Sequence, residues 1–236
     1  MTECIFHQDA YARSCEARVA RVDAGGVVLD RTVFYPLGGG QPGDCGHLRC
    51  ADGTRIEIVD TRKGEGGEVV HVPAPQAPVL APGTPVEAVL AWPRRHILMR
   101  YHTCLHLLCA VVDAPVSGGR MGEDKAHLDF DIEMDKLVAD DIERRLNALI
   151  AADVAVECGE ISDAELDANP ELVKTMSVQP PRGQGRVRTI SIPAVDLQPC
   201  GGTHVRRTAE IGPVRVVRIR SEGRRNKRVT IVLDHA

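Results

Sequence analysis

A proline-rich stretch divides the chain and limits where a regular element can run. Residues 73–85 hold five prolines in thirteen positions. Because proline lacks a backbone N–H donor, it is excluded from helix interiors and central strands. Before this stretch the hydrophobic pattern alternates with period two, and after it the pattern becomes helical. The sequence therefore predicts two domains, residues 1–88 and residues 89–236, joined near residues 85–92.

The N-terminal domain is expected to be a small β-barrel. Residues 17–36 form two alternating runs around a turn at Asp23–Gly26, and a second hairpin is expected over residues 47–60. Its turn at Asp52–Gly53 is of the Asp-Gly type that favours tight hairpins. Strands this short and this closely spaced are typical of a small barrel.

The C-terminal domain is expected to be α+β with a largely antiparallel sheet. Residues 92–112 predict a helix, since after Pro93 they run about twenty residues without glycine or proline. Asp135 is the expected N-cap of a second helix with one apolar stripe. Strands are expected at residues 127–133, 154–161, 186–192, 214–220 and 229–233, and a short helix at residues 163–172 is broken by Pro170.

Composition places the chain among globular proteins. Hydrophobic residues make up 43% and charged residues 26%, while aromatic residues make up only 3%, so Val, Leu, Ile and Ala must build the core. No apolar run reaches the ~18 residues that span a bilayer, and the N-terminus lacks a signal-peptide core. A cytoplasmic protein without a membrane partner is therefore expected, and nothing in the sequence fixes its oligomeric state. The eight cysteines contain no CxxC pair and are expected to be reduced.

Charge is distributed unevenly along the chain. The net charge of -4 argues against a general nucleic-acid binder. Residues 146–173 hold seven acidic and no basic side chains, whereas residues 206–228 hold nine basic side chains against Glu210 and Glu222. A basic tail on an otherwise acidic chain is consistent with phosphate binding and equally with a solvated β-ribbon.

Two spaced pairs of metal-binding residues are the strongest chemical signal. His102 and His106 lie four residues apart, so on a helix both imidazoles project from one face. Thr103 occupies the position where a zinc protease needs its glutamate, which argues against protease chemistry. Cys200 and His204 repeat the spacing around two glycines. Three nitrogens and one sulfur form a complete tetrahedral set and favour zinc over magnesium or calcium.

Three further features carry weaker signals. Cys109 shares the helix face of the histidines and is either a substitute ligand or, as we favour, a small buried residue. Residues 34–44 contain three consecutive glycines, which expose backbone N–H groups, and either cradle a polar ligand or form an ordinary turn. Residues 221–228 form an expected hairpin tip with four cations that either bind phosphates or are simply solvated.

These signals combine into the pattern of a known family. The chain resembles the freestanding alanyl-tRNA editing proteins, which are relatives of the editing domain of alanyl-tRNA synthetase. The resemblance is carried by YHTCLHLL (101–108), GGRMGEDKAHLDFD (118–131), DLQPCGGTHV (196–205) and EGRRNKRV (222–229), while FYPLGGGQPGD (34–44) resembles the glycine-rich motif of the longer members. The match covers nearly the whole chain in the family's order. The paired HTxxH and CGGTH motifs are otherwise shared with a threonyl-tRNA synthetase domain.

The resemblance implies hydrolysis of the ester in seryl-tRNA made in error on alanine tRNA, with the glycyl ester as a further candidate substrate. It implies zinc as the cofactor, with ligands at His102, His106, Cys200 and His204, and mischarged tRNA as the partner. It also implies that the loop Gly38–Gln41 forms part of the site. The candidate catalytic residues are Gln41, Thr103 and Thr203, although packing explains either threonine equally well; the candidate substrate-binding residues are Gly38, Gly39, Gly40, Arg224, Arg225, Lys227 and Arg228.

Two departures and two alternative functions accompany this interpretation. Glu222 stands where related sequences commonly have a lysine, and Ala91 stands where an acid often precedes Trp92. One alternative is a non-catalytic tRNA-binding module, because four protein ligands close a zinc shell as they do in structural sites. The other is editing of threonyl-type mischarging, since both metal motifs are shared. No ATP-binding signature is present, which argues against a synthetase.

Overall fold

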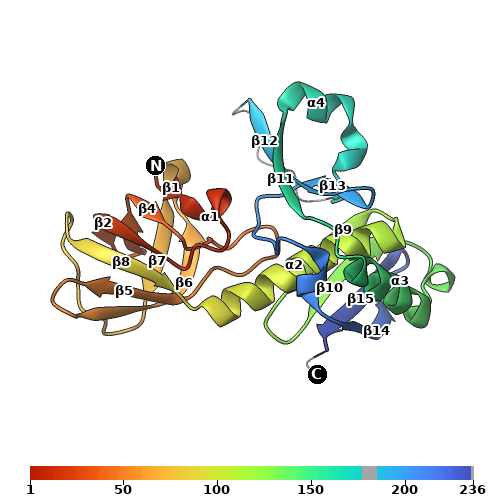
Figure 1. Cartoon of the computed structure of the whole chain (residues 1–236), viewed down its shortest axis with the longest axis horizontal. Coiled ribbons are helices and arrows are strands. Elements are labelled where there is room, and N and C mark those ends of the chain that lie inside the picture. Colours follow the sequence, from red (N-terminus) through yellow and green to blue (C-terminus); the bar gives the residue numbers. More distant parts are fainter. Residues whose placement is uncertain (177–184, 235–236) are drawn as a thin grey trace. The chain divides into compact units, whose positions relative to one another are not determined.

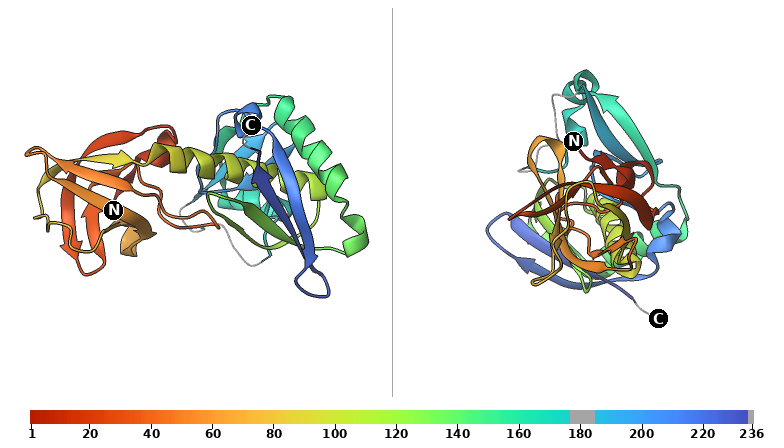
Figure 2. Two further views of the ribbon diagram at one scale, coloured as in Figure 1. Left: turned by 90° about the horizontal axis from the view of Figure 1, so that it is seen from below. Right: turned by 90° about the vertical axis from the view of Figure 1, so that its left-hand side faces the viewer.

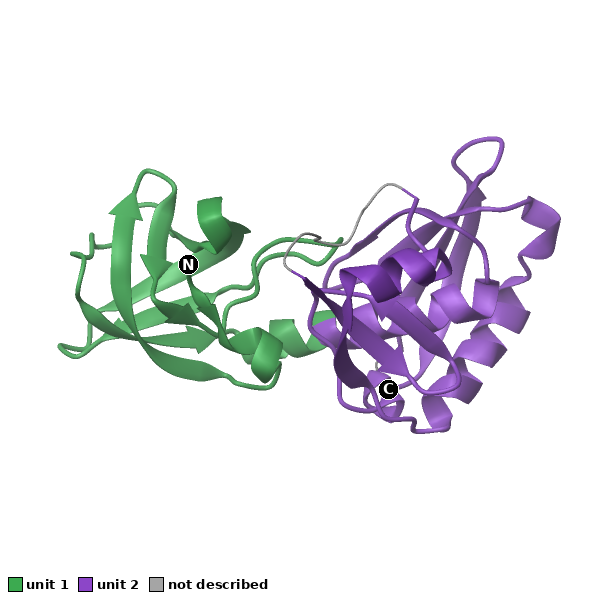
Figure 3. Ribbon diagram, turned by 90° about the horizontal axis from the view of Figure 1, so that it is seen from above, with its two compact units in different colours: residues 1–98 green, residues 99–236 purple. Residues whose placement is uncertain are grey.

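The computed structural model describes residues 1–176 and 185–234 (Figure 1). It divides into two compact units, Met1–Leu98 and Met99–Ala236 (Figure 3). Within the described residues, no helix has both the length and the apolar character that crossing a membrane requires.

The division between the units lies inside one long helix, α2 (Trp92–Val112). It therefore falls later in the chain than the limit that the sequence predicts. The domain limits 1–88 and 89–236 stay a prediction.

Unit 1 is built around a closed barrel of antiparallel strands in the order β2-β3-β7-β6-β5-β8. The predicted turns at Asp23–Gly26 and Asp52–Gly53 each connect two neighbouring strands. The strands are β2 (Ser14–Asp23), β3 (Gly26–Leu29), β5 (Gly46–Cys50), β6 (Arg55–Lys63), β7 (Val69–Pro73) and β8 (Pro85–Leu90). Outside the barrel lie β1 (Glu3–Cys4), which pairs in parallel with β4 (Arg31–Thr32), and the short helices α1 (Ile5–Gln8) and η1 (Glu65–Gly67). The predicted small barrel is confirmed.

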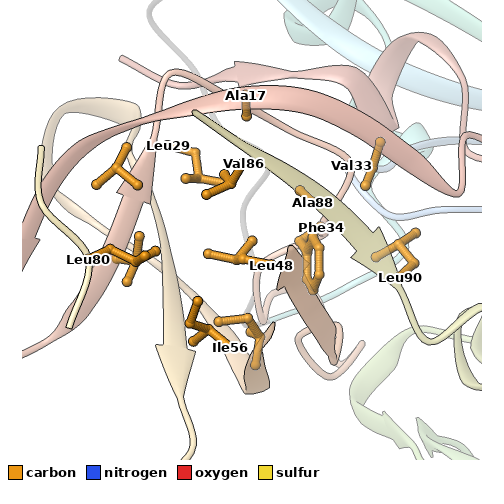
Figure 4. Close-up of a cluster of buried hydrophobic side chains, with 13 residues drawn as sticks. Ala17, Leu29, Val33, Phe34, Leu48, Ile56, Leu80, Val86, Ala88 and Leu90 are labelled. Carbon is orange, nitrogen blue, oxygen red and sulfur yellow. The ribbon is translucent and has the colours of Figure 1, made fainter. Parts of the chain in front are cut away.

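The barrel interior is filled mainly by aliphatic side chains, which come from β2, β3, β5, β6 and β8 (Figure 4). Alternation places Ile56 and Ile58 of β6 inward, while their neighbours along the strand are exposed. Phe34 is the single aromatic member of this buried cluster. With so few aromatic residues, close packing of Val, Leu, Ile and Ala stabilises the unit, at ~1.5–3 kcal/mol for each large apolar side chain buried.

Unit 2 contains a four-stranded antiparallel sheet with helices packed against it. The strand order is β14-β15-β10-β9, and α3 (Ala139–Ala151) packs against β14. α2 lies near the same sheet, because the backbone N–H of Leu233 donates to the Tyr101 hydroxyl at 3.2 Å. The strands are β9 (Val116–Met121), β10 (Ala126–Asp131), β14 (Val214–Ser221) and β15 (Asn226–Leu233).

A second sheet of unit 2, in the order β11-β12-β13, leads into the CGGTH segment. Its strands are β11 (Glu157–Ser162), β12 (Arg186–Ile192) and β13 (Asp196–Pro199). Ser162 and Glu165 form a reciprocal capping box at the start of α4 (Asp163–Ala168). The remaining elements are the short helices η2 (Met134–Lys136), η3 (Pro170–Leu172) and η4 (Thr208–Ile211). The predicted α+β class with antiparallel sheets is confirmed.

Several local predictions were wrong in detail. Asp135 does not cap α3: it lies in η2, and the helix begins after Val138, whose side chain makes no capping bond. The strand expected from residue 154 begins only at Glu157. In unit 2, two of the described strands were not predicted: β9 contains the pair Gly118 and Gly119, and β13 is four residues long and ends in proline. In unit 1, β1 and β8 were not predicted either.

His71 of β7 lies fully buried beside Phe34 in unit 1. Its Nδ1 donates to the carbonyl of Val27 at 3.0 Å, so its Nε2 accepts from the Thr32 hydroxyl at 2.8 Å. Burial lowers the pKa of His71 to about 4, although the bond to Val27 opposes the shift. The ring is therefore neutral at physiological pH and acts as a polar bridge between strands.

We expect the stability of unit 1 to fall in mild acid because of His71. Between about pH 6.5 and pH 4 the unfolded chain binds this proton and the folded chain does not, so lowering the pH favours unfolding by up to about 3 kcal/mol. Urea unfolding followed by fluorescence of the single tryptophan, Trp92, measures this loss. His71→Gln should show a flatter pH dependence over the same range, and equal slopes in the two proteins would contradict the prediction.

Candidate metal centre

The first half of the centre is carried by α2. His102 and His106 are one helical turn apart, and their ring centroids are 5.6 Å apart. Both side chains are nearly buried, with 7% of each residue exposed. The predicted projection of both imidazoles from one helix face is confirmed.

The second half is the turn that follows β13. Arg188 of β12 holds this turn, since its Nη1 donates to the carbonyls of Cys200 at 2.6 Å and Gly202 at 3.0 Å. The backbone N–H of Gly202 points back to the Cys200 sulfur, at 3.4 Å. This contact and the two carbonyl bonds fix Cys200 at the end of the sheet, and His204 follows four residues later.

The two halves converge on one point. Cys200 Sγ lies 3.5 Å from His102 Nε2 and 3.3 Å from His204 Nε2. The four ligand atoms, including one from His106, all lie within 4.8 Å of one another. A tetrahedral ion with metal–nitrogen distances of ~2.1 Å and a metal–sulfur distance of ~2.3 Å would separate nitrogen and sulfur by about 3.6 Å. The group can therefore hold a metal ion, and its nitrogen and sulfur donors fit zinc.

Electrostatics prepare the sulfur for this role. Burial alone raises the pKa of Cys200, but its interactions with the surrounding histidines, His102 first, overcome it and hold that pKa well below its usual value. The pKa of His204 is lowered to about 3, chiefly by burial and then by His102. A thiolate is the form of cysteine that binds zinc.

His106 has a carboxylate partner that sequence reasoning missed. Its Nδ1 lies 2.8 Å from Asp196 Oδ2, and only 2% of the Asp196 side chain is exposed. Burial lowers the pKa of His106, but the bonds to Asp196 and Cys200 outweigh it and raise that pKa to about 10. The sequence offered one signal for this partner. Asp196 stands four residues before Cys200, inside the segment 196–205 that carries part of the family resemblance.

The two candidate threonines are buried within the protein. Thr103 contacts Met99, His204 and Val205 through its hydroxyl. Thr203 is fully buried and also has a partner within the chain. Cys109 is buried on α2 and does not belong to the group of four ligands. Substrate contact by either threonine stays a prediction.

The glycine-rich segment forms a tight turn in unit 1. Gly38 and Gln41 exchange both backbone hydrogen bonds, at 3.1 and 3.0 Å. Gly39 and Gly40 have φ values of 56° and 79°, the left-handed values that a hairpin turn of this kind requires. A Cβ added at Gly39 would meet nothing within 4 Å, whereas the Gln41 side chain is fully buried. The functional role of this loop stays a prediction.

A buried ion pair anchors the end of this segment. Asp44 accepts the backbone N–H of Tyr35 at 2.6 Å and pairs with Arg95, from the first turns of α2. Arg95 also donates to the carbonyls of Val33 and Ala10, at 2.7 and 3.1 Å. Both charged side chains are almost completely enclosed, with 0% and 1% exposed. Sequence reasoning did not single out either residue.

The basic hairpin between β14 and β15 extends away from the body of unit 2 (Figure 2). Lys227 is buried, and its Nζ donates to the Ser221 hydroxyl and to the carbonyls of Gly223 and Arg224. The other cations of the segment differ in their surroundings: Arg225 pairs with Asp131, Arg228 pairs with Asp129, and Arg224 is exposed. Lys227 therefore holds the loop in shape, and phosphate binding by the four cations stays a prediction.

Comparisons with known proteins relate the chain to tRNA synthetases and their editing proteins. The family model described as threonyl and alanyl tRNA synthetase second additional domain matches residues 187–230, and the model for class II (A) tRNA synthetases matches residues 3–94. The alanyl-tRNA editing protein AlaX-M of Saccharolobus solfataricus is 33% identical over 97% of this chain and 98% of its own. AlaX-L of Pyrococcus horikoshii is 32% identical over 92% of this chain and 54% of its own, and the alanine–tRNA ligase of Aeropyrum pernix is 33% identical over 92% and 24%.

The chain is thus a relative of the tRNA synthetases, with a barrel followed by an α+β unit. The α+β unit contains a group of three histidines and one cysteine that could hold a metal ion. The domain models match both of its units. The chain belongs to the family of alanyl-tRNA editing proteins, and its match to the AlaX-M members extends over nearly their whole length. The resemblance drawn from its motifs is confirmed.

Proposed function

We propose that this protein is a zinc-containing hydrolase that removes serine from seryl-tRNA formed in error on alanine tRNA. The observation that carries the proposal is the convergence of His102, His106, Cys200 and His204 on one point, in a chain of the alanyl-tRNA editing family. Glycyl-tRNA on alanine tRNA is a second candidate substrate of the same site. We place the protein in the cytoplasm, with tRNA as its partner.

The proposed reaction requires little machinery, because an aminoacyl ester is already labile. A bound zinc ion supplies Lewis-acid chemistry, either by lowering the pKa of a water or by polarising the ester carbonyl. The four candidate ligands, which come from α2 and from the turn after β13, would hold this ion. Arg188 holds that turn through two carbonyls and so keeps Cys200 in register with the helix.

Hydrolysis of charged tRNA tests the proposal. The purified protein should release serine from seryl-tRNA on alanine tRNA and leave correctly charged alanyl-tRNA intact. The two substrates differ by one hydroxyl, and a site with a polar group placed for that hydroxyl can reject the analogue by up to ~10⁴-fold. Similar rates on the two substrates would indicate a general deacylase and contradict editing.

We expect the glycine-rich turn to contribute to this selectivity. Gln41→Ala removes a buried amide from the turn, and Gly39→Asn adds a side chain in open space at a φ of 56°, which asparagine tolerates. Each variant should reduce the ratio of seryl to alanyl hydrolysis while the zinc content stays at that of the wild type. An unchanged ratio in both variants would remove the turn from the specificity determinants.

Two other functions are separated by the same assay. A non-catalytic tRNA-binding module would bind zinc and tRNA without releasing any amino acid. An enzyme that edits threonyl-type mischarging would release serine from threonine tRNA in preference to alanine tRNA. The match of the first 94 residues to a class II (A) synthetase model and the full-length match to AlaX-M both favour the alanine system.

We propose that the hairpin tip contributes tRNA affinity through its exposed arginines. Replacing Arg224 and Arg225 together with alanine should weaken tRNA binding and lower the log–log salt slope by up to ~0.9 for each duplex phosphate that the variant no longer neutralises. Filter binding at several salt concentrations measures the slope. The matched control replaces Arg144 and Arg145, two exposed arginines of α3. Equal salt slopes in the tip variant and the wild type would show that these two arginines do not contact the tRNA phosphates.

A further inference from the structure

The Thr103 hydroxyl has a complete set of hydrogen-bond partners. Its oxygen lies 3.0 Å from the carbonyl of Met99, 3.2 Å from the backbone nitrogen of Val205 and 3.2 Å from His204 Nδ1. A hydroxyl has one proton to donate and two lone pairs that accept. Because a carbonyl can only accept, the proton of the hydroxyl goes to Met99, and both lone pairs remain for the two nitrogens.

This accounting determines which nitrogen of His204 carries its hydrogen. The hydroxyl proton is committed to Met99, so His204 Nδ1 must donate to Thr103. The hydrogen of the neutral ring therefore sits on Nδ1, and Nε2 is left with its lone pair. Nε2 is the atom that lies 3.3 Å from the Cys200 sulfur.

His106 is held in the same way by a different group. Its Nδ1 lies 2.8 Å from Asp196 Oδ2, and an ionised carboxylate only accepts. The two oxygens of Asp196 each accept from the Gln198 side-chain amide at 2.9 Å, which fixes the orientation of the carboxylate. His106 thus also carries a hydrogen on Nδ1, and Nε2 is the nitrogen that gives up its own proton when a metal binds.

We propose that Thr103 and Asp196 are positioning residues that preset His204 and His106 with Nε2 directed to a shared metal ion. This inference rests on the proposed function in one respect: it requires that the site binds a metal ion. It does not require that the protein acts on tRNA. It also explains the residue between the two helix histidines: Thr103 faces the turn from α2 and joins it through Val205 and His204 at once. Substitution of such outer partners typically costs 10–100-fold in metal affinity.

Zinc affinity tests the proposal without any tRNA. Thr103→Val keeps the shape of the side chain and removes the hydroxyl, whereas Thr103→Ser keeps the hydroxyl. In competition with a chromogenic zinc chelator at fixed pH, Thr103→Val should bind zinc ~10–100-fold more weakly than the wild type. Thr103→Ser should stay within about threefold of it, by the same expectation. Asp196→Ala should lose a similar factor, and because it acts on another histidine the two losses should multiply in the double variant.

The matched control is Asp129→Asn, which alters a buried carboxylate in the other sheet of unit 2, where it pairs with Arg228. It should leave zinc affinity unchanged, and thermal melts confirm that each variant is folded at the assay temperature. Affinity of Thr103→Val equal to that of the wild type would overturn the proposal. Equal losses in Thr103→Val and Thr103→Ser would also overturn it, because packing and not the hydroxyl would then be responsible. A wild-type protein that binds zinc normally but releases no serine from seryl-tRNA would instead count against the proposed function.

Discussion

Cys200→Ala should abolish both metal binding and hydrolysis of seryl-tRNA. The sulfur is the only donor of the group that is not an imidazole, and it lies within 3.5 Å of two of the three histidine nitrogens. Loss of a direct ligand should cost more than the ~100-fold upper value for outer partners. Metal analysis after dialysis and a seryl-tRNA hydrolysis assay on the same sample measure both effects.

Cys109→Ala is the control for this prediction. Cys109 lies on the same helix, is buried and stands outside the group of four ligands. The variant should keep about one zinc per chain and its activity, since only a small apolar side chain is trimmed. A zinc content that survives Cys200→Ala but disappears in Cys109→Ala would show that the wrong cysteine has been assigned to the site.

Arg95→Leu should cause the largest loss of stability in unit 1. It leaves the enclosed carboxylate of Asp44 without its cation and removes the donors to Val33 and Ala10. Breaking a buried ion pair by removing one partner costs ~3–5 kcal/mol. The free energy of unfolding in urea, followed by Trp92 fluorescence, measures the loss.

An exposed pair supplies the comparison. Arg62→Leu removes the partner of Asp60, in a pair where 62% of the arginine side chain is exposed. This change should cost no more than ~1 kcal/mol. In a background that already carries Arg95→Leu, Asp44→Asn should restore part of the loss, because no buried charge remains. Equal losses in Arg95→Leu and Arg62→Leu would contradict a dominant role for the buried pair.

The grouping of the four candidate ligands could be predicted from sequence because each pair is local. A spacing of four residues on a helix fixes the relation of His102 to His106 whatever the rest of the fold does. The partners of these ligands could not be predicted in the same way. Asp196 lies 90 residues from His106 in the chain, so only the tertiary structure brings them together.

The hairpin shows an error that the sequence itself could have corrected. Lys227 was grouped with the three arginines of the hairpin tip because it stands in a basic run. However, Val229, Ile231 and Leu233 alternate inward along β15, and a period of two places residue 227 on the same buried face. Its amine is therefore turned back onto the loop carbonyls.

The barrel was predictable because tight turns and alternation are local signals, whereas helix and strand ends depended on context. The apolar stripe predicted α3 but not its start, since Val138 follows the short helix η2 and has no capping side chain. β9 escaped notice because its two glycines carry no side chain to alternate. Pairing with β10 stabilises this strand, and the local sequence of β9 does not reveal that pairing.

The two halves of the metal centre lie far apart in sequence, and this separation limits the order in which the parts of the chain can fold during synthesis. Cys200 lies 98 residues after His102, so a shared ion closes a long loop. By chain-entropy arguments a cross-link of this span removes about 4–5 kcal/mol of freedom from the unfolded chain. On a ribosome that adds about 5–20 residues per second, Cys200 is synthesised several seconds after the histidines of α2. The barrel can fold in that interval, but the metal centre can form only after Cys200 and His204 have been made.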